Sequence, residues 1–444
     1  MAGEREFLRL RAIRGSEGAP VEIINCGGRA VIGNTDRAYS LVVEEGSAYF
    51  HITGTGDESI EYGFDLFAPA REPYPGVGLW LNGRSTNYEV DHVEIHDTGF
   101  AGVSAKTDPL CDGSADRARF TQRDTHLHHL YVHDTGGEGF YIGSTQSNGQ
   151  TINCDGRSEV REVHFLEGVE IHDNIIENTG WDGAQVGMAR VGCRIYRNTI
   201  RNVGIDREEF QMQGLQIGDF SSCEVFANRI ETGTANGIIV LGAGDLFVHS
   251  NLIVGFPEGN GIYANLRDRA AASYRFAFNT IVDTGGALRV FGGALEDSYA
   301  VSNFSVAAGA FEAGGDVGWS DRSNVIVSSR TEASFVDGTY VVTNESPAYG
   351  AGEALTEVPV DIDGVPRADP PAAGAYAYRT PGSDVGVLLD AGSPMDTGTS
   401  GGDGGVTNDA GPSESSGGCA AAPASGQVWF AFVLFALMRP RRRR

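Results

Sequence analysis

The sequence predicts an all-β protein, in which the chain winds as a single-stranded, right-handed parallel β-helix with coils of about 23–30 residues. One observation behind this is a repeated phrase, Asn followed by strand-forming residues, at intervals of 24, 30, 23, 28 and 24 residues. A period of this length indicates one small unit stacked on copies of itself. The phrase begins at Asn174, Asn198, Asn228, Asn251, Asn279 and Asn303.

Local pattern and composition support the same fold. In most repeats a Gly precedes a short apolar alternation, such as Gly214-Leu-Gln-Ile, and segments this short are typical of strands. The chain has 62 Gly among 444 residues and only 21% charged residues, which fits one long solenoid better than several globular domains. Successive coils lie about 4.8 Å apart. We therefore expect the repeated Asn side chains to stack into an internal ladder of amides.

Two earlier coils are longer than the others. Val93 and Leu130 stand where the ladder Asn is expected, and the intervals that follow them are 37 and 44 residues. These coils therefore carry two long insertions, and loops of that length in a compact protein are usually functional. The repeat resembles that of the pectate-lyase-like β-helix family, and the resemblance implies the fold.

The order of segments along the chain suggests three parts. We expect residues 1–378 to form the β-helix, with a C-terminal cap at about 307–378, where Val360-Asp-Ile-Asp-Gly resembles the closing phrase of bacterial surface β-helix proteins. Residues 379–418 are rich in Gly, Ser, Thr, Asp and Pro, which predicts a disordered linker. Residues 419–444 contain an apolar stretch and an Arg-rich end, which predicts a sorting signal or transmembrane segment.

This tail resembles the MYXO-CTERM sorting signal, with GlyGly-CTERM as a close relative. Gly417-Gly-Cys is followed by the apolar run Val428 to Met438 and by five arginines, at 439 and at 441–444. The resemblance implies an exported protein, at the cell surface or outer membrane, whose tail is recognised by a C-terminal sorting protease. A plain membrane anchor is the alternative. The first 20 residues carry no signal peptide, so we expect that the true start lies upstream.

The net charge and the cysteines indicate which classes of binding partner and which cellular compartment fit the sequence. The formal net charge is −26, or about −31 without the five arginines of the tail, which argues against nucleic acid as a partner. We expect a monomer. Cys111 and Cys154 each occur in a Cys-Asp-Gly triplet, one in each insertion, so a disulfide between them is plausible in an oxidising compartment. Cys193 and Cys223 stack on adjacent coils, and we interpret them as small buried apolar side chains, with a disulfide between them as the alternative.

A substrate groove is expected on the outer face from which both insertions leave. Aligning the Thr-Gly-x-x-Gly turns gives one column of outward strand positions and a second column just before each closing Gly. The first column holds Ser104, Tyr141, Gln185 and Gln216, and the second holds Glu138, Asp182, Gln213, Asn236 and Asn260. On the same side, Phe100, Trp181, Tyr141 and Tyr263 are candidates to stack on sugar rings.

Lys106 is the candidate catalytic base. It is the only lysine among 33 Lys and Arg residues and occupies an outward position beside the first insertion. A lysine can be tuned to lose its proton, whereas an arginine cannot. In the family that the repeat resembles, some lyases pair a Lys base with an Arg and Ca²⁺. No Arg stands in the groove column, so Arg119, Arg123, Arg157 or Arg190 would have to reach in from loops. The alternative is that Lys106 merely pairs with Asp108 or Glu138.

Glu138 and Asp182 lie on adjacent coils, and three interpretations remain open. They could bind Ca²⁺ together with Gln213, act as acid and nucleophile of a glycoside hydrolase, or belong to a structural polar ladder. Eight of the ten histidines fall between His92 and His172, and His126-Leu-His-His could bind a metal, although satisfied turn histidines are the commoner case.

The function predicted from these features is action on an acidic polysaccharide, most simply β-elimination by a lyase with Lys106 as base and Glu138 and Asp182 assisting. A non-catalytic glycan-binding or matrix protein is the first alternative, and a glycoside hydrolase using Glu138 and Asp182 is the second.

Overall fold

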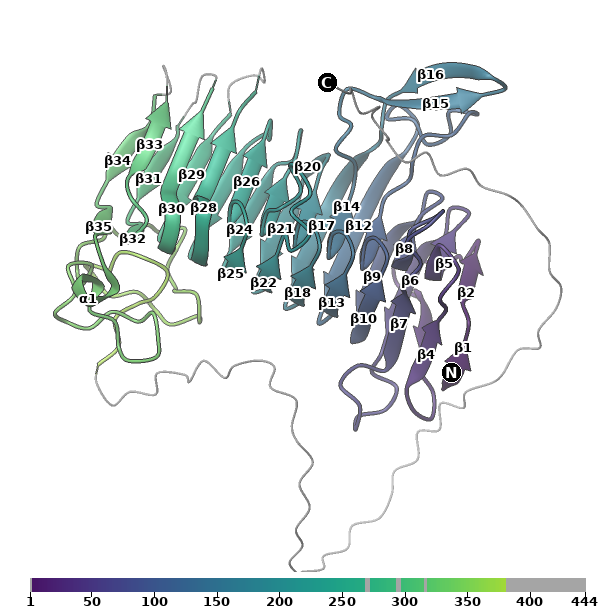
Figure 1. Ribbon diagram of the computed structural model, residues 1–444, viewed down its shortest axis with the longest axis horizontal. Coiled ribbons are helices and arrows are strands. Elements are labelled where there is room, and N and C mark those ends of the chain that lie inside the picture. Colours follow the sequence, from purple (N-terminus) through teal and green to yellow (C-terminus); the bar gives the residue numbers. More distant parts are fainter. Residues whose placement is uncertain (1, 268–271, 293–296, 315–317, 381–444) are drawn as a thin grey trace, which may run out of the picture. The chain divides into compact units, whose positions relative to one another are not determined.

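A right-handed parallel β-helix forms the body of the protein, as the repeat predicts. The computed structural model describes residues 2–267, 272–292, 297–314 and 318–380. One compact unit spans Met1–Arg379, and in Figure 1 its strands stack side by side along the long axis. The expected linker at 379–418 and the tail at 419–444 lie outside the described residues, apart from Arg379 and Thr380. Within the described part of the chain, no helix has the length and apolar character needed to span a membrane.

Most strands belong to one sheet of 21 strands, in which each regular coil contributes two. Its strands are β1 (Gly3–Arg5), β2 (Leu8–Arg11), β4 (Ala30–Gly33), β5 (Tyr39–Glu44), β7 (Phe64–Ala68), β8 (Val77–Leu81), β10 (Val93–Thr98), β11 (Val103–Ala105), β13 (Tyr131–Thr135), β14 (Phe140–Ile142), β18 (Ile175–Thr179), β19 (Ala184–Val186), β22 (Thr199–Val203), β23 (Leu215–Ile217), β25 (Arg229–Gly233), β26 (Ile238–Leu241), β28 (Leu252–Asn265), β30 (Thr280–Phe291), β32 (Phe304–Val306), β33 (Phe311–Gly314) and β35 (Val325–Val327).

A 12-stranded sheet forms the remaining side of the solenoid, and one hairpin and one short helix stand outside the stack. The sheet contains β3 (Val21–Ile24), β6 (Ala48–Thr53), β9 (Thr86–Asp91), β12 (Thr121–His128), β17 (Phe165–His172), β20 (Ala189–Val191), β21 (Cys193–Tyr196), β24 (Cys223–Phe226), β27 (Leu246–His249), β29 (Tyr274–Ala277), β31 (Tyr299–Val301) and β34 (Ser320–Arg322). The antiparallel hairpin is β15 (Gln150–Cys154) with β16 (Arg157–Arg161), and the helix is α1 (Arg330–Ala333).

The Asn ladder is present and runs one step further than predicted. The six predicted Asn residues are at most 1% exposed, and the column ends at Asn324, which the sequence analysis missed. Each side-chain amide donates to the side-chain oxygen of the next Asn, for example Asn198 to Asn228 and Asn228 to Asn251, both at 2.9 Å. The amide also donates to a strand carbonyl, and the oxygen accepts a backbone N–H. The ladder therefore satisfies the turn backbone of every coil it passes.

Close packing of the coils explains the glycines that close the Thr-Gly-x-x-Gly turns. A Cβ atom on Gly183 would lie 2.4 Å from the side chain of Ile200 and 2.6 Å from the carbonyl of Gly214, both on the next coil. The same conflict recurs at Gly139 and Gly214. These positions need Gly because the next coil occupies the space that any side chain would take.

The paired strands continue beyond the boundary expected for the C-terminal cap. β33, β34 and β35 pair with the preceding coil, so the stack reaches Val327 rather than ending near residue 306. The segment with the closing phrase runs along the flank of earlier coils. It contacts Arg229, Ser250, Thr280 and Ser302, which belong to four successive coils.

Asp361 holds this C-terminal segment in shape. The Asp361 side chain is fully buried and accepts backbone N–H groups of Asp363, Val365 and Ala377. It also forms an ion pair with Arg379 at 3.3 Å. The two oxygens of an Asp side chain at this position can accept all of these donors at once, which explains why the phrase needs an Asp there.

Replacing Asn228 by Leu tests the ladder. The change removes the bonds to Asn251 and Ile195, and it takes away the acceptor shared by the backbone N–H and the side-chain amide of Asn198. Each buried polar group left unpaired costs roughly 1–3 kcal/mol. We expect the free energy of unfolding, measured by urea denaturation, to fall by about 3 kcal/mol. Asn344→Leu, at an exposed position outside the ladder, should leave it within about 0.5 kcal/mol. Equal stabilities of the two variants would contradict the assigned role.

Candidate functional site

The outer face beside the two insertions brings the predicted groove residues together. Ser104, Tyr141, Gln185 and Gln216 align in one row on β11, β14, β19 and β23. The residues on either side of them along each strand, such as Phe140 and Ile142, point into the core. Tyr263 lies in the same row on β28, with Ile239 between it and Gln216. At about 4.8 Å per strand, the row from Ser104 to Tyr263 spans about 24 Å, which is long enough for several sugar units.

Much of this row is covered. Ser104, Gln185 and Gln216 are 2%, 1% and 5% exposed, and the amide of Gln216 donates to the side-chain oxygen of Gln185 at 2.8 Å. These three side chains are therefore covered by their neighbours, and their contact with a polymer stays a prediction. Tyr141, Trp181 and Tyr263 remain partly exposed. Phe100 packs edge-on against both Tyr141 and Trp181, with ring centroids 6.0 and 5.6 Å apart.

Lys106 is held close to this face. Its side chain is 18% exposed, and its Nζ lies 3.0 Å from Asp108 Oδ1 and 4.6 Å from the centre of the Tyr141 ring. Burial alone would lower the pKa of Lys106, but Tyr141, Asp108 and Glu138 together raise that pKa above its ordinary value. The ammonium is therefore charged at neutral pH.

The residues around Lys106 fix where the first insertion starts. The backbone N–H of Thr107 donates to His164 Nε2 at 3.1 Å, and His164 belongs to the end of the second insertion. Burial lowers the pKa of His164 to about 4, so the ring stays neutral and its nitrogen can accept this bond. The bases of the two insertions are thus joined directly beside Lys106.

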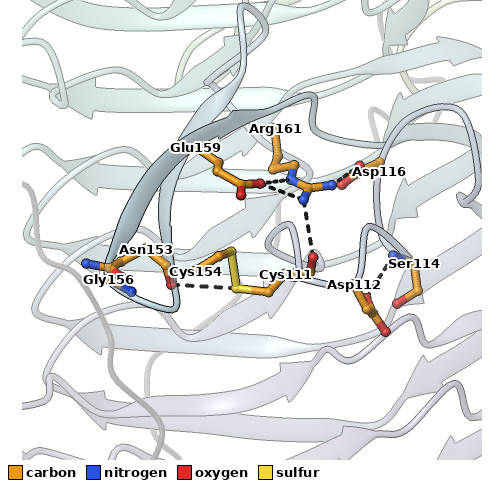
Figure 2. The surroundings of a disulfide bond; sticks show 9 residues. All are labelled: Cys111, Asp112, Ser114, Asp116, Asn153, Cys154, Gly156, Glu159 and Arg161. Carbon is orange, nitrogen blue, oxygen red and sulfur yellow. Dashed lines mark hydrogen bonds and ion pairs between the residues drawn. A yellow bond between two sulfur atoms is a disulfide. The ribbon is translucent and has the colours of Figure 1, made fainter.

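A disulfide joins the insertions further out. Cys111 and Cys154 are bonded, which confirms the predicted pair, and Cys154 ends the strand β15 of the hairpin. Figure 2 shows Arg161 on the opposite hairpin strand turned toward the first insertion. Its guanidinium donates to Asp116 at 3.0 Å and to the carbonyl of Cys111 at 3.2 Å. The two loops are therefore one cross-linked structure. Cys193 and Cys223 are also bonded, so their interpretation as free buried side chains is wrong.

The arginines considered as partners of Lys106 are engaged elsewhere. Arg119 donates to the carbonyl of Asp112, and Arg123 and Arg190 both pair with Glu167. Arg157 lies exposed on the hairpin strand β16. The loops contain no repeat from which their register could be predicted, so these contacts could not be foreseen from sequence.

The second predicted column is buried rather than lining a groove. Glu138, Asp182 and Gln213 are 2%, 0% and 4% exposed, which corrects the prediction that they face the substrate. Gln213 donates its backbone N–H to Asp182 Oδ1 at 2.7 Å, and its side-chain oxygen accepts from Asn236, which accepts from Asn260. The column is thus a second polar ladder. Buried where they are, Glu138 and Asp182 do not flank a bond of a polymer on the outer face as a glycoside hydrolase requires.

The acidic end of this ladder is incompletely paired. Among the described residues, Glu138 Oε2 and Asp182 Oδ2 are buried without a hydrogen-bond partner. Burial raises the pKa of Glu138 to about 7 and the pKa of Asp182 well above its ordinary value. Two unpaired carboxylate oxygens on adjacent coils fit a divalent cation such as Ca²⁺. Gln213 does not fit that role, because its side-chain oxygen is already used by Asn236.

The raised pKa of Glu138 predicts how stability depends on pH. The folded protein holds this proton more tightly than the unfolded chain, whose carboxyl has its ordinary value of 4.5. This stabilisation is present below pH 4.5 and is lost as the pH rises through about 7. As the pH rises from 5 to 9, ionisation of Glu138 should therefore lower the free energy of unfolding by on the order of 3 kcal/mol.

Glu138→Gln should remove this part of the pH dependence, measured by urea denaturation across that range, whereas Glu208→Gln at an exposed position should not. If Ca²⁺ binds at Glu138 and Asp182, adding it should flatten the profile of the parent protein only. Identical profiles for the parent and Glu138→Gln would show that Glu138 does not hold a proton near neutral pH.

Comparisons with known proteins agree with the fold. No family model matches the sequence, and no curated protein matches it. Among solved structures, the chain is similar to a pectate lyase, Pel9A, with a TM-score of 0.51 and 10% identity over 85% of this chain and 97% of that one. It also matches the A-module of a mannuronan C-5 epimerase from Azotobacter vinelandii, with a TM-score of 0.39 and 12% identity over 74% of this chain and 90% of that one. At 10% identity, the likeness to the pectate lyase shows the right-handed parallel β-helix fold that the repeat predicts.

Proposed function

We propose that the protein is a lyase that cleaves an acidic polysaccharide, and that the polymer binds at the Lys106 face, defined here as Lys106 with Phe100, Tyr141 and Trp181. The observation that carries this proposal is the position of Lys106. The only lysine of a chain with a net charge of −26 is held between Asp108 and the ring of Tyr141, directly beside two cross-linked insertions. The polysaccharide-acting neighbours in fold are consistent with this class of substrate.

Binding of an acidic polymer needs local positive charge and flat apolar surface. Elsewhere the acidic surface would repel a chain of uronic acids, so the Lys106 ammonium supplies the attraction. The partly exposed rings of Phe100, Tyr141 and Trp181 pack together next to it and suit stacking against sugar rings.

The chemistry of β-elimination assigns a role to each of two side chains. The bond from C5 to hydrogen breaks, its electron pair forms the C4–C5 double bond, and the C4–oxygen bond breaks as that oxygen takes up a proton. A charged Lys106 suits neutralisation of the adjacent carboxylate, because its pKa is raised rather than lowered. In the Ser104–Tyr141–Gln185–Gln216 row, Tyr141 is the titratable side chain, so we assign both proton transfers to it. Its phenolate takes the C5 proton, and the phenol so formed gives a proton to the leaving O4, which restores the phenolate.

Glu138 and Asp182 are the residues that would hold a divalent cation behind this face. When bound there, Ca²⁺ would supply further positive charge near the substrate carboxylate. Lys106 itself was predicted from sequence to be the base, and that role requires an uncharged amine, which Tyr141, Asp108 and Glu138 disfavour because they raise the pKa of Lys106.

Export to the cell surface belongs to the same proposal. Two disulfides, Cys111–Cys154 and Cys193–Cys223, are typical of an oxidising compartment. The sorting tail and its protease rest on the resemblance of the segment from Gly417 onward, which lies outside the described residues.

The test is an assay of uronic-acid polymers for the absorbance of the unsaturated product, with variants at Lys106 and Tyr141. If Lys106 neutralises charge, Lys106→Arg should keep activity within about tenfold, and Lys106→Met should lose roughly 100-fold or more. Tyr141→Phe should lose about 100-fold to 10,000-fold. Arg207→Met, an exposed cation paired with Glu258, is the control and should match the parent.

Two outcomes would change the proposal. Equal loss in Lys106→Arg and Lys106→Met would assign proton abstraction to Lys106 and remove it from Tyr141. Saturable binding of a uronic-acid polymer without any unsaturated product would replace the lyase with a non-catalytic glycan-binding protein.

A further inference from the structure

We infer that a second site, on the outer face of the 12-stranded sheet, binds a zinc ion through His51, Glu89 and Asp91. One ligand atom from each of these side chains lies within 4.8 Å of the other two. A nitrogen and two carboxylate oxygens at this separation can converge on one Zn²⁺, with water completing the coordination. The site is separate from the Lys106 face, which lies on strands of the other sheet.

The register of two neighbouring strands creates the cluster. His51 lies on β6 opposite Glu89 on β9, and Asp91 lies two residues further along β9, opposite Thr53. Side chains two apart on a strand point to the same face. His51, Glu89 and Asp91 alternate with the core residues Phe50, Ile52, Tyr88 and Val90 and therefore project outward together.

Supporting residues hold the two carboxylates in place. Asp91 Oδ1 accepts the Thr53 hydroxyl at 2.7 Å and lies 2.6 Å from His92 Nδ1. Glu89 Oε1 lies 2.8 Å from His128 Nε2, on the next coil. Such outer contacts orient metal ligands and are typical of metal sites. The Asp91 side chain is 5% exposed and that of Glu89 is 43% exposed, so the cluster is fixed on one side and open to solvent on the other.

The charge of the cluster favours a cation. Further along the same sheet, Glu170 and Glu224 are accompanied by Arg194. In the described part of the chain, by contrast, the ion-pair partners of Glu89 and Asp91 are all histidines. The cluster thus combines two carboxylates with histidine partners and, among the described residues, no Arg or Lys in an ion pair with either carboxylate, so a divalent cation can take the place of those ion pairs.

The donor set selects the metal. Imidazole together with carboxylate suits Zn²⁺ and similar transition metals, whereas Ca²⁺ and Mg²⁺ prefer oxygen ligands alone. The ion would join β6 to β9 and so cross-link two successive coils near the N-terminal end of the solenoid.

The experiment is calorimetric titration of the full chain, without an affinity tag, with ZnCl₂, CaCl₂ and MgCl₂. We expect one zinc ion per chain at this cluster and no competition from Ca²⁺ or Mg²⁺ there. His51→Ala and Glu89→Gln should each weaken Zn²⁺ binding by roughly 100-fold or more, and His128→Ala by about 10-fold to 100-fold, as expected for a residue that positions a ligand.

The matched control is His133→Ala. His133 is also half-buried between two carboxylates, Glu94 and Asp134, but lies on β13, outside the cluster. The His133→Ala variant should bind zinc as tightly as the parent protein. Because Glu89 is partly solvent-exposed and Gln has nearly the same shape, Glu89→Gln should fold even if His51→Ala does not, and far-UV circular dichroism checks this. In addition, Zn²⁺ should raise the melting temperature of the parent but not that of Glu89→Gln.

The inference is overturned if the parent shows no saturable Zn²⁺ binding. It is also overturned if Glu89→Gln and His51→Ala bind zinc as the parent does, or if Glu138→Gln, on the other face, removes the binding. None of these results depends on finding a polysaccharide substrate.

Discussion

The structure depends on the stacking of one coil directly on the next, at the spacing of hydrogen-bonded strands. Backbone bonds between coils set that spacing, and the buried Asn ladder satisfies the turns that the sheets leave unpaired. Because each Asn both donates to the next coil and accepts from the preceding one, no step can shift without breaking bonds on two sides. The closing glycines follow from the same constraint, since the adjacent coil occupies the space of a side chain.

Stacking also places the side chains of equivalent positions on successive coils directly next to one another, in a column. In the Asn column each side-chain amide has a donor on one neighbour and an acceptor on the other, so the repeated Asn residues satisfy one another's hydrogen-bonding groups. The second column begins as acids and continues as amides, and only the amides can pair with one another in this way. Glu138 and Asp182 therefore each carry a buried oxygen without a hydrogen-bond partner, and both have raised pKa values. A position that the ladder does not need for its own stability is a natural place for function.

Sequence predicts the parts of this protein that repeat, and it fails where a residue occurs once. The ladder was predictable because its Asn recurs at similar intervals, and the two insertions were predictable because they lengthen the intervals after Val93 and Leu130. The Cys111–Cys154 bond was predictable because each insertion carries the same Cys-Asp-Gly triplet. Glu138 and Asp182 were placed on the wrong side because a turn, unlike a strand, has no alternation to tell inside from outside. His51 was missed because no Asn marks the coil in which it lies, so its alignment with Glu89 was invisible. The course of residues 346–379 was missed for the same reason, since nothing in a closing phrase specifies which coils it touches.

The C-terminal segment changes how the solenoid can come apart. A stack held only by contacts between neighbouring coils can unfold one coil at a time from its end. Here Arg229 bonds to Asp363, 134 residues away, and Ser250, Thr280 and Ser302 bond to the same returning segment. The last coils are thereby tied to one another along their side and must detach that segment before any of them can separate. The last coils should therefore unfold together in one cooperative step rather than one at a time. The strand edges that stepwise unfolding would expose to other molecules then remain paired.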